Sequence, residues 1–188
     1  MIDKDAFITF FERISETDYV VMRGFDNLFE SVNNGEDIDI LVSNKEKFVE
    51  LTGAVPKDKE SKFNYLVDIG GQEVEVDLRS VGDGYYDEKW EKNLLNSKII
   101  RDGFMIPHGE VYDYSIVYHV LIHKEKISSK YYKELEKKFG TYSRQKLIGI
   151  LVRYMTEHGY SIEIPIDVGV YYNKKNAFWC KLSQRIMI

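Results

Sequence analysis

Acidic residues recur at alternate positions in two apolar segments of the chain. Residues 37–42 read DIDILV, and residues 73–78 read EVEVDL. Because successive side chains of a strand point to opposite faces, each segment would present its acids on one face and its aliphatic residues on the other. If the two strands pair in register, Asp37, Asp39 and Asp77 converge. Three carboxylates on rigid strands suit Mg²⁺, which takes oxygen ligands and completes its coordination with water and substrate phosphates.

Two further residues belong to the same predicted face. Glu75 is the alternative third carboxylate, since it alternates with Asp77 along the strand. Arg79 follows on the same face, where it either contacts a phosphate group or forms an ion pair within the sheet. The alternative for the whole acidic pattern is the solvated face of an amphipathic strand.

The first 108 residues mix helical and strand patterns. A hairpin is expected around Gly70-Gly71, because glycine readily adopts the positive φ angles of a two-residue turn. Apolar spacing, candidate caps and turn residues indicate the other elements. We expect helices over 4–16, 25–32, 44–51 and 85–95, and strands over 19–22, 37–42, 64–69, 72–80 and 98–100.

Beyond residue 109 the apolar pattern becomes helical. We expect one long helix from Glu110 to about Ile122, a second over 131–139, and a third around 147–155 that ends before Gly159. Residues 160–188 receive no assignment. The chain is therefore predicted to be of the mixed α/β (α+β) class, with a mixed-sheet core over 1–108 and a C-terminal helical region over 109–188 packed on it.

Composition limits the function further. The chain has 188 residues and a net charge of -5, which argues against extensive nucleic-acid binding. Cys180 is the only cysteine, so an internal disulfide and a cysteine zinc cluster are excluded, and a reducing compartment is indicated. No apolar run approaches the ~20 residues that span a bilayer, and the first residues lack a signal-peptide profile. We expect a cytoplasmic protein without a transmembrane segment, whose oligomeric state the sequence does not indicate.

The order of these motifs resembles the nucleotidyltransferase superfamily, which includes the polymerase-beta-like enzymes. The family pattern is a hydrophobic residue, Gly, then Gly or Ser, a spacer of roughly a dozen residues, and an Asp-hydrophobic-Asp/Glu-hydrophobic strand. Here residues 22–25, MRGF, stand at the turn and residues 37–40, DIDI, at the acidic strand. The chain departs from the pattern at Phe25, where the family has a small residue that lets a triphosphate approach.

This resemblance implies a role for each residue of the motif. Asp37 and Asp39 would bind two divalent metal ions, Mg²⁺ or Mn²⁺, and Asp77 would be the third carboxylate, which assists the attacking hydroxyl. Gly24 would position the triphosphate. From its residue type alone, and not from the resemblance, Arg23 is expected to supply a phosphate contact there as a bidentate donor. The implied reaction transfers a nucleotidyl group from a nucleoside triphosphate to a small-molecule or glycan acceptor. The alternatives are a non-catalytic nucleotide-binding module of the same fold and a phospho-alcohol transferase that acts on surface glycans.

Residues 112–124 also look like nucleotidyltransferase-like proteins that accompany cell-surface polysaccharide synthesis. Within this segment, His119 and His123 lie four residues apart and would share one face of a helix. Three roles are open for this pair. The histidines bind a metal, or His123 and Lys124 contact phosphate or the acceptor, or the histidines form ordinary hydrogen bonds between helices.

Overall fold

The computed structural model describes residues 1–59 and 62–187 and confirms the mixed α/β class. The chain forms two compact units. The first consists of 1–83 and 91–108, and the second of 84–90 and 109–188. The change of unit between His108 and Gly109 coincides with the expected domain boundary. Residues 84–90, which we assigned to the first domain, belong to the second unit.

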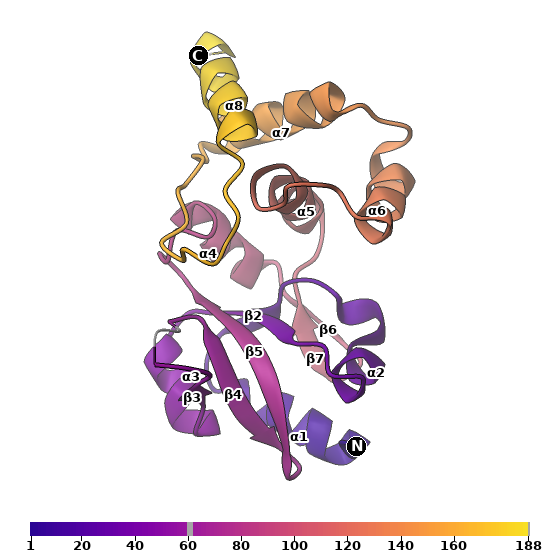
Figure 1. The fold of residues 1–188 in the computed structure, drawn as a ribbon, viewed down its shortest axis with the longest axis vertical. Coiled ribbons are helices and arrows are strands. Elements are labelled where there is room, and N and C mark those ends of the chain that lie inside the picture. Colours follow the sequence, from indigo (N-terminus) through magenta and orange to yellow (C-terminus); the bar gives the residue numbers. More distant parts are fainter. Residues whose placement is uncertain (60–61, 188) are drawn as a thin grey trace. The chain divides into compact units, whose positions relative to one another are not determined.

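The first unit contains a five-stranded sheet in the order β1-β2-β5-β4-β3 (Figure 1). β2 and β5 are parallel, and the other neighbouring strands are antiparallel. Because the β4–β5 hairpin turns at Gly70-Gly71, both hairpin strands have the bounds predicted from the sequence. The strands are β1 (Tyr19–Val21), β2 (Ile38–Val42), β3 (Val55–Pro56), β4 (Asn64–Ile69) and β5 (Gln72–Ser80).

The two faces of this sheet differ in chemistry. Ile38 pairs with Val76 and Ile40 with Leu78, and all four side chains are buried on the apolar face. The helices α1 (Lys4–Ile14) and α3 (Lys45–Thr52) contact the sheet strands and each other. Buried aliphatic and aromatic side chains therefore hold the sheet rigid while its opposite face carries the alternating acids.

Shorter elements complete the first unit. A 3₁₀ turn, η1 (Phe25–Asn27), leads directly into α2 (Leu28–Asn33). The two elements occupy the segment 25–32 that was expected to be helical. β6 (Ile99–Arg101) pairs with β7 (Phe104–Ile106) as a separate two-stranded sheet. The Tyr19 hydroxyl accepts a hydrogen bond from the Met105 backbone N–H at 3.1 Å, which ties β7 to β1. α4 (Glu88–Asn96) begins in the second unit and ends in the first.

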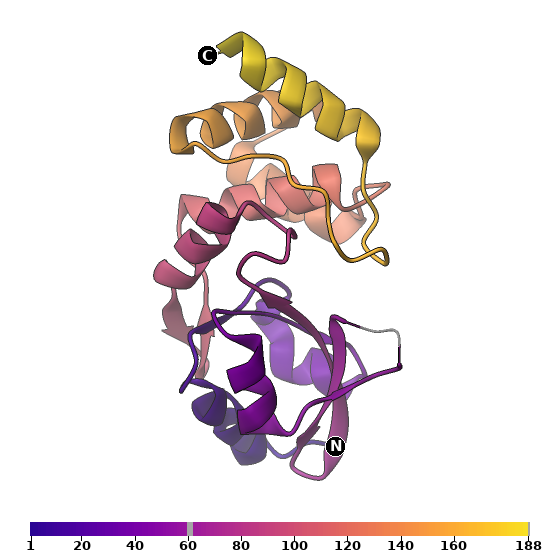
Figure 2. The same ribbon diagram turned by 90° about the vertical axis from the view of Figure 1, so that its left-hand side faces the viewer.

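The second unit is helical. Its helices are α5 (Glu110–Ile122), α6 (Ser129–Phe139), α7 (Arg144–His158) and α8 (Lys174–Met187). α8 packs against α7, and both contact α5 (Figure 2). Aromatic side chains fill this unit: the rings of Trp90 and Tyr160 stack at 4.8 Å, and those of Tyr114 and Tyr154 at 4.0 Å. These aromatic side chains thus form part of the packed core of the second unit.

Several expectations need correction. β2 begins at Ile38, one residue later than predicted, because its ladder with β5 starts there. The short strands β3 and β7 were not predicted, and α8 occupies most of the tail that received no assignment. Over the described residues, no helix combines the length and apolar character needed to cross a bilayer.

Candidate functional site

The polar face of the sheet brings two of the predicted acids together. Asp39 on β2 is the direct neighbour of Asp77 on β5, because the parallel register pairs their Cα atoms. Their side chains are partly covered, with exposed fractions of 20% and 16%. Asp37 precedes β2 and is exposed, so the ladder does not fix it beside the other two. Asp39 and Asp77 are therefore neighbours in the sheet, whereas Asp37 lies just before the first residue of β2.

The turn after β1 lies next to this pair. Gly24 has φ 72°, in the left-handed region, and is the residue before η1. The Met22 N–H donates to the Asp39 carbonyl oxygen at 2.9 Å, which ties the turn to β2. Phe25, the bulky residue that departs from the family pattern, is buried with an exposed fraction of 7%. Its ring packs inward and the Arg101 guanidinium lies over it, 5.6 Å from the centroid.

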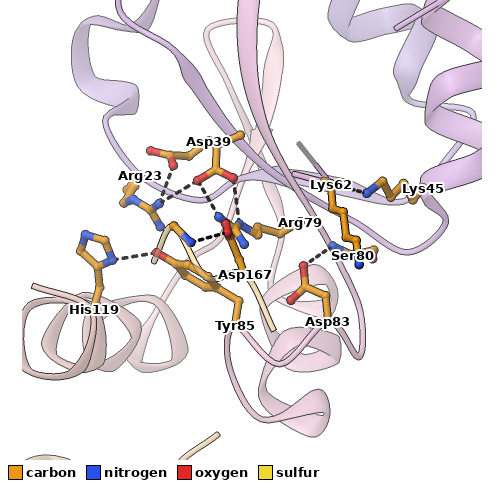
Figure 3. A network of polar contacts seen from close by, with 12 residues as sticks. Arg23, Asp39, Lys45, Lys62, Arg79, Ser80, Asp83, Tyr85, His119 and Asp167 are labelled. Atoms are coloured by element: carbon orange, nitrogen blue, oxygen red, sulfur yellow. Dashed lines mark hydrogen bonds and ion pairs between the residues drawn. The ribbon is translucent and has the colours of Figure 1, made fainter. Parts of the chain in front are cut away.

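Arg23 lies within this turn and points at the acids. Its Nη2 donates to Asp39 Oδ1 (Figure 3). The same Nη2 lies 3.9 Å from Asp77 Oδ2. The side chain is nearly buried, with an exposed fraction of 8%. A guanidinium group has a rigid fork of N–H donors that matches carboxylate and phosphate oxygens equally well. Arg23 is thus placed to exchange a carboxylate partner for a phosphate.

Arg79 lies two residues after Asp77 on β5, on the same face of the strand. Its Nη2 donates to Asp77 Oδ2 at 3.2 Å, and its Nε lies 2.8 Å from Oδ1. The guanidinium also stacks on the Phe63 ring, 4.5 Å from the centroid. Of the two roles expected for Arg79, the ion pair within the sheet is the one observed. Phe63 was not identified from the sequence, because nothing in its neighbourhood marks a stacking partner.

The electrostatics of the site are dominated by the burial of Asp39. The pKa of Asp39 is raised to about 6 from 3.8, mainly by burial and also by the nearby negative charges of Asp77 and Asp37. Arg23 and Arg79 act in the opposite direction. The carboxyl group of Asp39 is therefore short of positive charge even with both guanidinium groups in place. A bound cation would relieve this deficit.

Glu75, the alternative third acid, is engaged elsewhere. Its Oε2 lies 2.6 Å from Lys57 Nζ in an ion pair at the rim of the sheet. Beside it is a hollow of about 440 Å³. Among its lining residues are Gly35, Glu36, Lys57, Leu66, Glu73 and Glu75.

The donor chemistry of the face suits a divalent cation. Carboxylate oxygens from Asp37, Asp39 and Asp77 are the ligand type that Mg²⁺ and Mn²⁺ prefer. Within residues 1–59 and 62–187, no three His, Cys, Asp or Glu side chains are already gathered as a metal-binding group. Instead Arg23 forms an ion pair with Asp39, and Arg79 forms one with Asp77. In their chemistry, Asp37, Asp39 and Asp77 are suitable ligands for a divalent cation.

The loop after β5 is held by two acids that were not identified from the sequence. Asp83 Oδ2 accepts from the Ser80 N–H at 3.1 Å (Figure 3), and Glu91 Oε2 accepts from the Gly82 N–H at 2.7 Å. Glu91 is fully buried. A glutamate within a polar helical stretch gives no sequence signal for this role. These bonds fix the end of β5 and with it the position of Arg79.

The remaining predicted site residues belong to the second unit. His123 is buried at the end of α5, where its ring lies 4.3 Å from that of Tyr85, while Lys124 is exposed. His119 Nδ1 lies 2.9 Å from the Tyr85 hydroxyl, within hydrogen-bond distance (Figure 3). Both histidines are thus part of an aromatic cluster. Their observed partner comes from the segment before α4, and the sequence did not single out Tyr85.

Comparisons with known proteins add no relative. No family model matches the chain, and no curated protein and no solved structure is significantly similar to it.

Proposed function

We propose that the chain is a metal-dependent nucleotidyltransferase, which transfers a nucleotidyl group from a nucleoside triphosphate to a small-molecule or glycan acceptor. One observation carries the proposal. Asp39 and Asp77 face each other across parallel strands, and a left-handed glycine turn places Arg23 against both. In phosphoryl transfer, paired carboxylates hold metal ions and a cationic side chain binds phosphate oxygens.

Each side chain has a distinct task in this proposal. Asp37, Asp39 and Asp77 would hold Mg²⁺ or Mn²⁺, which neutralises charge on the triphosphate. Arg23 leaves Asp39 and binds phosphate oxygens through its fork. Asp77 assists the acceptor hydroxyl, whose oxygen forms a bond to the α-phosphorus. The bond from that phosphorus to the β-phosphate oxygen breaks, and pyrophosphate leaves.

A second candidate is a non-catalytic nucleotide-binding module of the same fold. The observation in its favour is that Arg23 and Arg79 already pair with Asp39 and Asp77. If these ion pairs persist in every state, the acids are structural. Metal-dependent ligand binding that requires the two carboxylates separates the candidates.

The test is a thermal shift with each of four ribonucleoside triphosphates and with CDP-choline, with and without Mg²⁺ or Mn²⁺. Ligand at about 100 times its Kd adds roughly 2.7 kcal/mol, which raises Tm by about 5–10 °C in a chain of this size. We expect this rise in the wild type and in Glu73→Gln, a matched change on the same face of β5. It should disappear in Asp39→Asn and Asp77→Asn.

A shift that needs no metal and survives both Asn variants would contradict the enzyme and favour the binding module. A rise confined to CDP-choline would instead favour a donor that carries a phospho-alcohol.

A further inference from the structure

One side of α8 exposes large apolar side chains. Phe178, Trp179, Leu182 and Ile186 have exposed fractions of 60%, 48%, 36% and 76%. Residues three or four positions apart lie on the same side of a helix, so these four side chains form a continuous apolar strip. Isolated apolar residues are common on protein surfaces, whereas a strip of this kind marks a contact surface.

The opposite side of α8 is anchored within the second unit. Asn176, Ala177 and Cys180 are buried, and Asn176 Nδ2 donates to the Leu121 carbonyl oxygen at 2.6 Å. Near the C-terminal end of the helix, Gln184 Nε2 donates to a backbone carbonyl of the same unit at 2.9 Å. Rotating α8 to hide the strip would break both bonds. The apolar strip therefore faces outward in the folded unit.

The charges of α8 are all positive. The helix contains Lys174, Lys175, Lys181 and Arg185 and no Asp or Glu. With about 100° between successive residues, three of these cations flank one edge of the strip, and Lys175 lies within it. The second unit as a whole has more Lys and Arg than Asp and Glu, although the full chain is acidic.

A hollow beside the strip combines the same two chemistries. It measures about 480 Å³ and lies between α7 and α8. Ile148 and Trp179 give it apolar walls, and Arg144 and Lys175 give it cationic ones. Such a lining suits an amphiphile with an anionic head.

We propose that α8 is an interfacial helix that docks the protein on an anionic membrane surface. Aromatic and aliphatic side chains of the strip enter the boundary between headgroups and acyl chains, while the flanking cations pair with lipid phosphates. Lys175 suits this location because a lysine can bury its stem and extend its ammonium group to a headgroup.

A second copy of the chain is a poorer occupant. A symmetric contact between two strips would bring the cations of both helices together without acids on α8 to balance them. The inference is independent of the proposed function, since its test needs neither nucleotide nor metal.

The experiment is sedimentation of the full chain with vesicles of phosphatidylcholine alone or of phosphatidylcholine with phosphatidylglycerol. We expect binding to the anionic vesicles that weakens with added salt. Trp179 provides a second readout, because Trp90, the other tryptophan, is fully buried. Its emission should shift to the blue when the strip enters the bilayer.

Two variants test the two parts of the surface. Phe178→Ser/Trp179→Ser removes apolar area, and Lys174→Glu/Arg185→Glu reverses two exposed charges. We expect each to weaken binding to anionic vesicles at least about tenfold. The matched control Lys133→Glu/Lys137→Glu makes the same charge change on α6 and should bind within about threefold of the wild type. Unchanged far-ultraviolet circular dichroism checks that every variant is folded.

Three results would overturn the proposal. The first is the absence of sedimentation with anionic vesicles, and the second is equal loss of binding in the α6 control. The third is a concentration-dependent dimer that the Phe178→Ser/Trp179→Ser change abolishes while vesicles bind no protein. This result would assign the strip to a second copy of the chain.

Discussion

At the scale of single residues, two buried guanidinium groups decide what the acidic face can do. Arg79 is fully engaged by Asp77 and Phe63 and has an exposed fraction of 3%. Arg23 touches both acids and sits in a turn next to a glycine. Removing one partner of a buried pair leaves an uncompensated charge, so each arginine supports the acids structurally. Only Arg23 is placed to serve a ligand as well.

The raised pKa of Asp39 predicts a pH dependence of stability. The pKa is about 6 in the folded protein and 3.8 ordinarily, so between these values the folded state binds more protons than the unfolded one. The contribution of Asp39 to the free energy of unfolding therefore falls as pH rises from 4 to 6 and is level above 7. Relative to Asp39→Asn, the wild type should lose on the order of 2 to 3 kcal/mol over this range.

Urea denaturation of both proteins in metal-free buffer at several pH values measures this difference. A wild type that gains stability relative to Asp39→Asn as pH rises would show that Arg23 outweighs burial and lowers the pKa.

At the scale of elements, the turn between β1 and η1 determines where Arg23 points. Gly24 has φ 72° and no atom lies within 4 Å of the position of an added Cβ, so Gly24→Ala introduces backbone strain without a clash. We expect a loss of about 1–2 kcal/mol in the free energy of unfolding for Gly24→Ala. Gly24→Asn should lose less, because Asn tolerates the left-handed region.

Chemical denaturation with an unchanged m-value is the measurement. If Gly24→Ala were more stable than the wild type, the turn would not require a positive φ, and the placement of Arg23 would need another explanation.

Local sequence patterns predicted some of these elements correctly. Alternation in β2 and β5 predicted that Asp39 and Asp77 share a face, because a period of two leaves little choice once one face is buried. The hairpin followed from Gly70-Gly71. These are local signals that single residues carry.

Features that depend on contacts between distant parts of the chain could not be predicted, because no local residue pattern encodes them. β7 is a strand because it packs on β1 and pairs with β6, and α8 is a helix whose exposed apolar strip obscures the usual amphipathic pattern. The stacking of Arg79 on Phe63 and the burial of Glu91 depend on contacts that no spacing rule predicts. The types and spacing of residues identified the acids in the sequence. Which arginine pairs with which acid depends on tertiary packing.

At the scale of the whole molecule, charge is divided between the two units. The first unit carries the excess of acidic residues, including the candidate site, and the second carries an excess of Lys and Arg. The net charge of -5 hides this division. A single total therefore gives a poor guide to partners here, because the acidic candidate site and the cationic helix α8 belong to one chain.

The proposed function requires that Asp39 and Asp77 hold a divalent cation together with a nucleotide. Its most direct test is an electron paramagnetic resonance titration of Mn²⁺ with the protein and the nucleoside triphosphate that stabilises it most, with nucleotide alone as the blank. We expect protein-bound Mn²⁺ that depends on nucleotide, persists in Glu73→Gln and is lost in Asp39→Asn and Asp77→Asn. Equal Mn²⁺ binding by all four proteins, or none by the wild type, would contradict it.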